Sequence, residues 1–170
     1  MNNNEKDVQF MRLAHHISLW SKEQGRRVGA VIIGPDDEVR STGHNGFPRG
    51  VNESIPSRHS RDTGEKYFWS SHAERNAIYN AARMGVSLKG CTIYVPWFPC
   101  CECAKAIIQS GIAEIVAYEP DFTEPKWGLD HKNVLVMLKE GGVIVRFIEI
   151  LAELSTGELG APDNDCLTRP

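Results

Sequence analysis

The feature that most constrains this chain is a pair of short motifs whose side chains could together bind one metal ion. The first is His-Ala-Glu at residues 72–74, and the second is Pro-Cys-Cys-Glu-Cys at residues 99–103. In the first turn of a helix, Cys100 and Cys103 would place both sulfur atoms on one side, where the positive helix end favours thiolates. Zinc in a catalytic site takes three protein ligands and keeps its fourth tetrahedral position for water. The motifs therefore predict one Zn²⁺ per chain, bound by His72, Cys100 and Cys103.

Glu74 follows His72 by two positions, which places its carboxylate beside the metal without binding it. We expect Glu74 to act as a general acid and base for the metal-activated water. Two plainer interpretations remain. His72 and the cysteines could be ordinary buried residues, or the zinc could be structural, although such a site normally takes a fourth Cys or His. Cys101 is the nearby spare thiol, and in a helix it points away from the other two.

Charge and composition exclude several classes of partner. The net charge of -3 and the pI near 6.1 provide no excess of positive charge for a phosphate backbone, so no polynucleotide partner is expected. Five cysteines, with Cys100, Cys101 and Cys103 crowded together, suit metal binding in a reducing compartment better than disulfides. No apolar stretch is long enough for a membrane span, and the N-terminus lacks a secretory core. We expect a cytoplasmic protein that does not bind membranes.

Hydrophobic periodicity and turn residues predict alternating helices and strands after an N-terminal helix and a hairpin. The first helix has an apolar stripe that ends at Trp20, and residues 44–71 form a long polar segment of the kind that often serves as a binding loop or lid. This order indicates one α/β domain over residues 1–152, with helices on both faces of a sheet, and a polar tail over 153–170. The predicted helices are 7–23, 71–84, 100–109 and 133–139, and the predicted strands are 28–33, 39–43, 91–95, 112–118 and 143–148.

Three segments resemble one known family, the zinc-dependent cytidine and deoxycytidylate deaminases. FPCCECAKAIIQSGI at residues 98–112 is similar to the zinc helix of deoxycytidylate deaminases, and SHAERNAI at 71–78 carries the H-x-E part of the signature of zinc nucleobase deaminases. GHNGFPRG at 43–50 resembles that family's substrate loop, GYNGxPxG. The resemblance implies a cytidine-deaminase-like three-layer α/β/α sandwich with a central mixed sheet of about five strands. It also implies hydrolysis of dCMP to dUMP and ammonia.

By this resemblance, Asn45 would hydrogen-bond the deoxyribose and the backbone at Ala73 would hold the pyrimidine. The plainer interpretation of Asn45 and Gly46 is a simple turn. A phosphate requires donors, and the polar segment offers a set of basic residues from which we name Arg49 as the candidate. The whole set is Arg49, Arg58, Arg61 and Lys66. Trp97 and Phe98, just before the zinc helix, are candidates for lining the base pocket.

The chain also departs from the family pattern. His44 replaces the usual tyrosine of the substrate loop, and Phe122 stands near a position where relatives often have a tyrosine. The alternatives are therefore a deaminase of cytidine, deoxycytidine or a guanine-type base, or a noncatalytic zinc-stabilised binding module. Some relatives bind a second zinc in the segment before the H-x-E motif, but here it has His59 and no cysteine, so one zinc is expected. The resemblance further implies a homo-oligomer, in many relatives a hexamer regulated by dCTP and dTTP.

Overall fold

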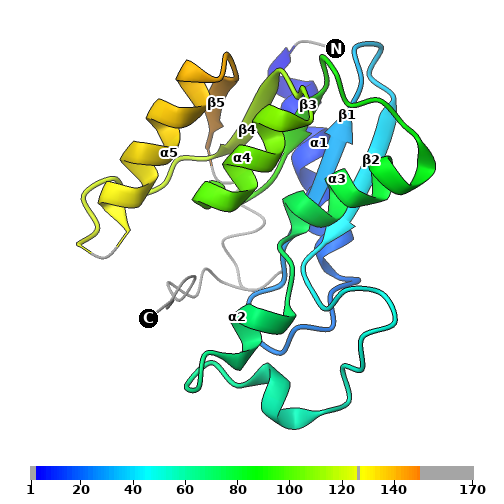
Figure 1. Cartoon of the computed structure of the whole chain (residues 1–170). Coiled ribbons are helices and arrows are strands. Elements are labelled where there is room, and N and C mark those ends of the chain that lie inside the picture. The colour runs from blue at the N-terminus through cyan, green and yellow to red at the C-terminus, as the bar shows by residue number, and fades with distance from the viewer. Residues whose placement is uncertain (1–2, 126, 150–170) are drawn as a thin grey trace.

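The computed structural model describes residues 3–125 and 127–149 as a sheet flanked by helices (Figure 1). The strands are β1 (Gly29–Ile33), β2 (Val39–His44), β3 (Thr92–Tyr94), β4 (Glu114–Tyr118) and β5 (Ile144–Ile148). The helices are α1 (Asn3–Ser18), α2 (Glu65–Trp69), α3 (Ala73–Met84), α4 (Cys101–Gln109) and α5 (Gly128–Glu140), with a single 3-10 turn, η1, at Pro56–His59. The predicted tail from residue 153 lies outside the described residues. Among the described helices, none is both long and apolar enough to cross a membrane.

The five strands form one mixed sheet in the order β2-β1-β3-β4-β5, which confirms the predicted mixed sheet of about five strands. β1 pairs antiparallel with both β2 and β3, while β3, β4 and β5 run parallel. A tight turn suffices between the antiparallel β1 and β2. The parallel strands instead need long crossovers, and α4 and α5 supply them. The carboxyl ends of β3 and β4 consequently lie at the same edge of the sheet.

Alternating side chains on the strands divide the core into two layers, one on each face of the sheet. On one face, α1 packs against buried strand residues through Met11, Ala14 and Ile17. On the other face, α3, α4 and α5 contribute Ala77, Ile107 and Leu138, among others, to a larger cluster. Figure 1 shows α1 behind the sheet and α3 and α4 in front of it. This arrangement confirms the expected three-layer α/β/α sandwich.

Three predicted elements differ from those observed. α1 ends at Ser18 rather than near residue 23, because the next amides bond back three residues, as in Leu19 N–H to the His16 carbonyl at 3.1 Å. Trp20 therefore leaves the buried stripe and is 59% exposed. The polar segment 44–71 is not structureless, since it contains η1 and α2, and α5 begins at Gly128, earlier than the predicted residue 133.

Close backbone contacts bind the H-x-E segment to the sheet. A Cβ atom at Gly43 on β2 would lie 2.5 Å from the Ala73 carbonyl oxygen and 2.3 Å from the Ala77 nitrogen, so only glycine lets α3 approach this closely. Gly46 and Ser71 also exchange two backbone hydrogen bonds, of 3.0 and 2.8 Å. The start of α3 is thus held against both β2 and the loop that follows it.

A buried histidine on α1 should make the stability of the fold depend on pH. His15 Nε2 lies 2.9 Å from the Tyr118 hydroxyl, and burial lowers the pKa of His15 to about 4. The unfolded chain then binds a proton that the folded chain does not, from about pH 6.5 down to pH 4. Stability should therefore fall as the pH is lowered through this window, by roughly 2 kcal/mol after allowance for solvent screening.

This prediction can be checked by urea unfolding at a series of pH values. In His15→Gln, the unfolding free energy should vary less with pH between 4 and 6.5 than in the wild type. His16→Gln is the matched control, because His16 is the exposed neighbour of His15 on α1. An unchanged pH slope in His15→Gln would contradict the assignment.

Candidate metal centre and active site

Two helix N-termini meet to form the candidate metal centre. His72 is the N-cap residue of α3, Cys100 is the N-cap residue of α4, and Cys103 lies in the first turn of α4. His72 Nδ1 is 3.4 Å from Cys100 Sγ and 3.5 Å from Cys103 Sγ, and the three potential ligand atoms all lie within 4.8 Å of one another. The structure thus brings together the three residues that the sequence nominated.

The donor set fits zinc. One imidazole nitrogen and two thiol sulfurs are ligands that Zn²⁺ takes in tetrahedral sites, and three of them leave the fourth position open. Cys101 is exposed, and its Sγ is directed towards the Glu102 carboxylate, 3.9 Å away, so it lies outside this group. A structural site with four protein ligands is therefore not what these residues form.

The three residues are electrostatically coupled even without a cation. The hydrogen bond from Cys103, together with His72, lowers the pKa of Cys100 to about 3, although burial opposes the shift. Burial pushes the pKa of His72 down, but Cys100 and Glu74 outweigh it and the net shift is upward. A divalent cation bound by these three residues would displace the protons that they carry.

Glu74 is the second residue of α3 and is only 5% exposed. Burial is the largest cause that raises the pKa of Glu74, with the negative charge of Cys100 acting in the same direction and His72 opposing it. A hydrogen bond with the Cys103 side chain acts in the opposite direction and lowers the pKa of Glu74. A buried carboxyl group with a raised pKa, beside an open metal position, is equipped to accept and return a proton.

Asn45 has an unexpected set of partners. Its Nδ2 donates to the Arg26 carbonyl at 2.9 Å, its Oδ1 accepts from the Val28 N–H at 2.8 Å, and its own N–H donates to the Val28 carbonyl at 3.0 Å. The side-chain amide therefore fixes the turn before β1. Contact between Asn45 and a deoxyribose stays a prediction, and so does the proposed role of the Ala73 backbone.

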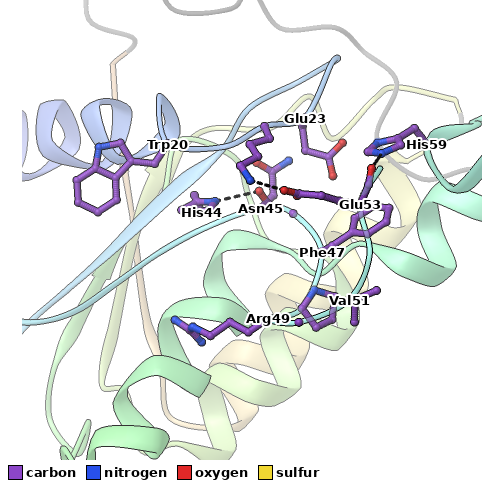
Figure 2. Close-up of a pocket in the computed structure, with 13 residues that line it drawn as sticks. Trp20, Glu23, His44, Asn45, Phe47, Arg49, Val51, Glu53 and His59 are labelled. Carbon is purple, nitrogen blue, oxygen red and sulfur yellow. Dashed lines mark hydrogen bonds and ion pairs between the residues drawn. The ribbon is translucent and has the colours of Figure 1, made fainter. Parts of the chain in front are cut away.

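A cavity of about 360 Å³ lies beside the loop that carries Asn45 and Arg49 (Figure 2). Its lining includes His44, Phe47 and His59, but His72, Glu74, Cys100 and Cys103 are not among the residues that line it. The stacked rings of Phe47 and His59, 4.9 Å apart, form part of its wall.

Other side chains contact three of the nominated basic residues. The Arg49 guanidinium donates to Asn80 Oδ1 at 2.6 Å, and Asn80 is about two turns along α3 from His72. The Arg58 guanidinium lies 3.8 Å from the centroid of the Trp69 ring. Lys66 Nζ lies 2.7 Å from a Glu23 carboxylate oxygen. A role for Arg49 as a phosphate ligand stays a prediction.

Aromatic residues surround the segment that leads into α4. The Phe98 ring packs edge-on against Phe122, at a centroid distance of 6.3 Å, and it also contacts His131 and Phe147. Trp97 carries the Arg26 guanidinium 4.2 Å above its ring. The sequence alone did not predict this contact, because it joins segments that are far apart in the chain and no spacing pattern marks it.

Comparison with known proteins places these features in one family. Residues 4–119 match the model of the cytidine and deoxycytidylate deaminase zinc-binding region. The chain is 38% identical, over 84% of its length and 92% of the relative's, to an uncharacterized deaminase from the luxG 3′ region of Aliivibrio fischeri. It is 39% identical to human deoxycytidylate deaminase, over 63% of this chain and 61% of the human one. The chain belongs to the zinc-dependent cytidine and deoxycytidylate deaminase family.

Solved structures agree on the fold. The crystal structure of dCMP deaminase from the cyanophage S-TIM5 superposes with a TM-score of 0.65 at 22% sequence identity, over 87% of this chain and 100% of the other. At this identity the likeness concerns the fold, which is the expected cytidine-deaminase-like sandwich. The three-ligand centre and the family together identify the cofactor as zinc, and the site formed by His72, Cys100 and Cys103 is consistent with one zinc ion.

Proposed function

We propose that this zinc-dependent deaminase converts dCMP and water to dUMP and ammonia. The observation that carries the proposal is the buried carboxyl group of Glu74 beside a three-ligand zinc site with an open position. Relatives named deoxycytidylate deaminase at 34–39% identity, from human to phage T4, support dCMP as the substrate. The cyanophage enzyme with the same fold has been crystallised with dCMP and dUMP.

When bound at this centre, zinc supplies a water activated for attack at neutral pH. Glu74 takes a proton from the attacking water and delivers it to ring N3 while the water oxygen bonds to C4. Glu74 then takes the remaining proton from the new C4 hydroxyl and transfers it to the exocyclic amine; the C4–N4 bond breaks as the C4 carbonyl forms, and ammonia leaves. The carboxyl group returns to its starting state, so one residue serves as both base and acid.

The start of α3 is suited to hold the pyrimidine. Ala73 is the first residue of the helix and is fully buried. The first amide groups of a helix have no intrahelical acceptor, so the Ala73 N–H is available to a carbonyl oxygen of the base. The ring would then lie with its amine directed towards the three ligands and Glu74.

A substrate panel tests the proposal. Ammonia release by the zinc-loaded chain should be measured with dCMP, deoxycytidine, CMP, cytosine and guanine. We expect the highest kcat/KM for dCMP, because the phosphate adds charge-assisted hydrogen bonds that a nucleoside lacks. A higher kcat/KM for deoxycytidine, or turnover of guanine alone, would replace dCMP with that substrate and leave the deaminase chemistry intact.

A further inference from the structure

Two asparagine side chains of α3 hold the edge strand β2. Because β2 lies at one end of the described sheet, the backbone groups on its outer side need partners other than a neighbouring strand. Asn76 Nδ2 donates to the His44 carbonyl at 2.8 Å, and Asn80 Nδ2 donates to the Thr42 carbonyl at 2.7 Å. At these two carbonyls, the amides of α3 take the place that a further strand would fill.

The spacing of these hydrogen bonds sets the register of α3 along β2. Four residues of an α-helix rise about 6 Å, which is the separation of Asn76 and Asn80 along the helix axis. Two residues of a strand extend about 6.6 Å, which is the separation of Thr42 and His44. Because the two lengths agree, both amides reach a carbonyl at the same time, and sliding the helix along the strand would break both bonds.

Asn76 joins the catalytic end of α3 to the loop of the GHNGFPRG motif. Asn76 lies two residues after Glu74, and its own N–H donates to the His72 carbonyl at 3.0 Å. His44, whose carbonyl it binds, directly precedes Asn45 in the loop (Figure 2). One side chain therefore links the helix turn that carries the metal ligand and the catalytic carboxyl group to the residue expected to contact the sugar.

Both chain neighbours of Asn45 are thereby fixed to the start of α3. Gly46, on the other side, exchanges two backbone hydrogen bonds with Ser71, of 3.0 and 2.8 Å. The Ser21 hydroxyl donates to the Asn45 carbonyl at 2.8 Å, from the segment that follows α1. Of these contacts, that of Asn76 depends on a side chain of α3 itself. A loop that is already fixed does not have to be ordered when the substrate binds, which lowers the entropic cost of binding.

We propose that Asn76 is a positioning residue for the deamination, because its hydrogen bond to the His44 carbonyl preorganises the loop at residues 43–50 for the sugar of the substrate. This inference rests on the proposed function and on the expected contact between Asn45 and the sugar. Asn76 acts through the loop. It therefore determines how tightly the substrate binds and not how fast the bound substrate reacts.

The test separates KM from kcat. In Asn76→Ala, KM for dCMP should rise roughly 10-fold while kcat changes by no more than about threefold, because a preorganised loop stabilises the bound substrate and the transition state equally. Asn76→Asp keeps the size of the side chain but loses the donor, so it should show the same split. Ser41→Ala is the matched control, because the Ser41 hydroxyl donates to the Ala77 carbonyl at 2.7 Å and joins β2 to α3 without reaching the loop. The control should lower the melting temperature and leave KM unchanged.

Hydrogen exchange gives a readout that does not depend on turnover. Amide exchange in residues 44–50, followed by mass spectrometry, should be faster by at least about tenfold in Asn76→Ala and unchanged in Ser41→Ala. Zinc content, measured for each variant, should stay at one ion per chain. Should Asn76→Ala not fold, the same measurements on Asn76→Asp decide the question.

The outcomes separate this inference from the proposed function. If the wild type converts dCMP and Asn76→Ala leaves KM unchanged or lowers only kcat, the positioning role is overturned while the proposed function stands. If the wild type turns over deoxycytidine or CMP but not dCMP, the proposed substrate is wrong, and the split between KM and kcat on that substrate decides the positioning role. Turnover of a free base alone, or of none of the panel, overturns both. Unchanged amide exchange in Asn76→Ala overturns the positioning role in every case.

Discussion

Replacing Glu74 by Gln should abolish turnover while leaving the zinc in place. The amide has nearly the shape of the carboxyl group but cannot take a proton from the attacking water. General acid–base catalysis contributes up to about 10⁴-fold, and Glu74 serves twice in the reaction, so we expect kcat to fall by at least about 10³-fold. Zinc binding should be much less affected, since Glu74 is not one of the ligands of the metal centre.

The measurement is the rate of ammonia release together with zinc content by elemental analysis. Glu102→Gln is the matched control, because Glu102 is also an acidic residue in the first turn of a helix but pairs at the surface with Lys105, at 2.6 Å. The control should keep near-normal activity. A Glu74→Gln protein that retains zinc and near-normal activity would remove Glu74 from the catalytic role.

The second large effect concerns the metal itself. In Cys103→Ala the centre keeps one imidazole and one thiol, which is too few for a stable catalytic zinc site. Loss of partners that merely orient a ligand already costs 10- to 100-fold in affinity, so loss of a ligand should cost at least about 100-fold. We expect the purified variant to contain little zinc and to show no activity.

Cys101→Ala supplies the control for this experiment, because the Cys101 thiol is exposed and separate from the three-ligand group. Zinc per chain should be measured after dialysis against a competing chelator. The wild type and Cys101→Ala should both retain one zinc ion. The opposite pattern, with zinc lost from Cys101→Ala and kept by Cys103→Ala, would overturn the assignment of ligands.

Local sequence patterns were sufficient to predict the features that depend on residues close together in the chain. The spacing of Cys100 and Cys103 predicts two sulfur atoms on one side of a helix start, and the apolar runs at 28–33 and 112–118 predict the buried strands β1 and β4. The end of α1 was not predictable in this way. Trp20 continues the helical periodicity in the sequence, but the backbone leaves the helix at Ser18 and exposes the ring.

Contacts between distant segments could not be predicted from spacing. The sequence nominated Asn45 for the substrate, whereas the structure shows its side chain fixing the turn at Arg26 and Val28. Arg49 was nominated for the phosphate because it stands in a polar loop, yet its guanidinium binds Asn80 on α3. Such pairings depend on how the loops fold over the sheet.

The expected homo-oligomer, the single-domain limits at residue 152 and the polar tail likewise stay predictions.

The central claim, that a zinc site and Glu74 together hydrolyse the amine of dCMP, is tested most directly by one assay. Conversion of dCMP to dUMP should be followed before chelation, after chelation, and after zinc is added back. We predict turnover that is lost with the metal and restored with one zinc ion per chain. A chain that holds one zinc ion and still converts no dCMP would contradict the account.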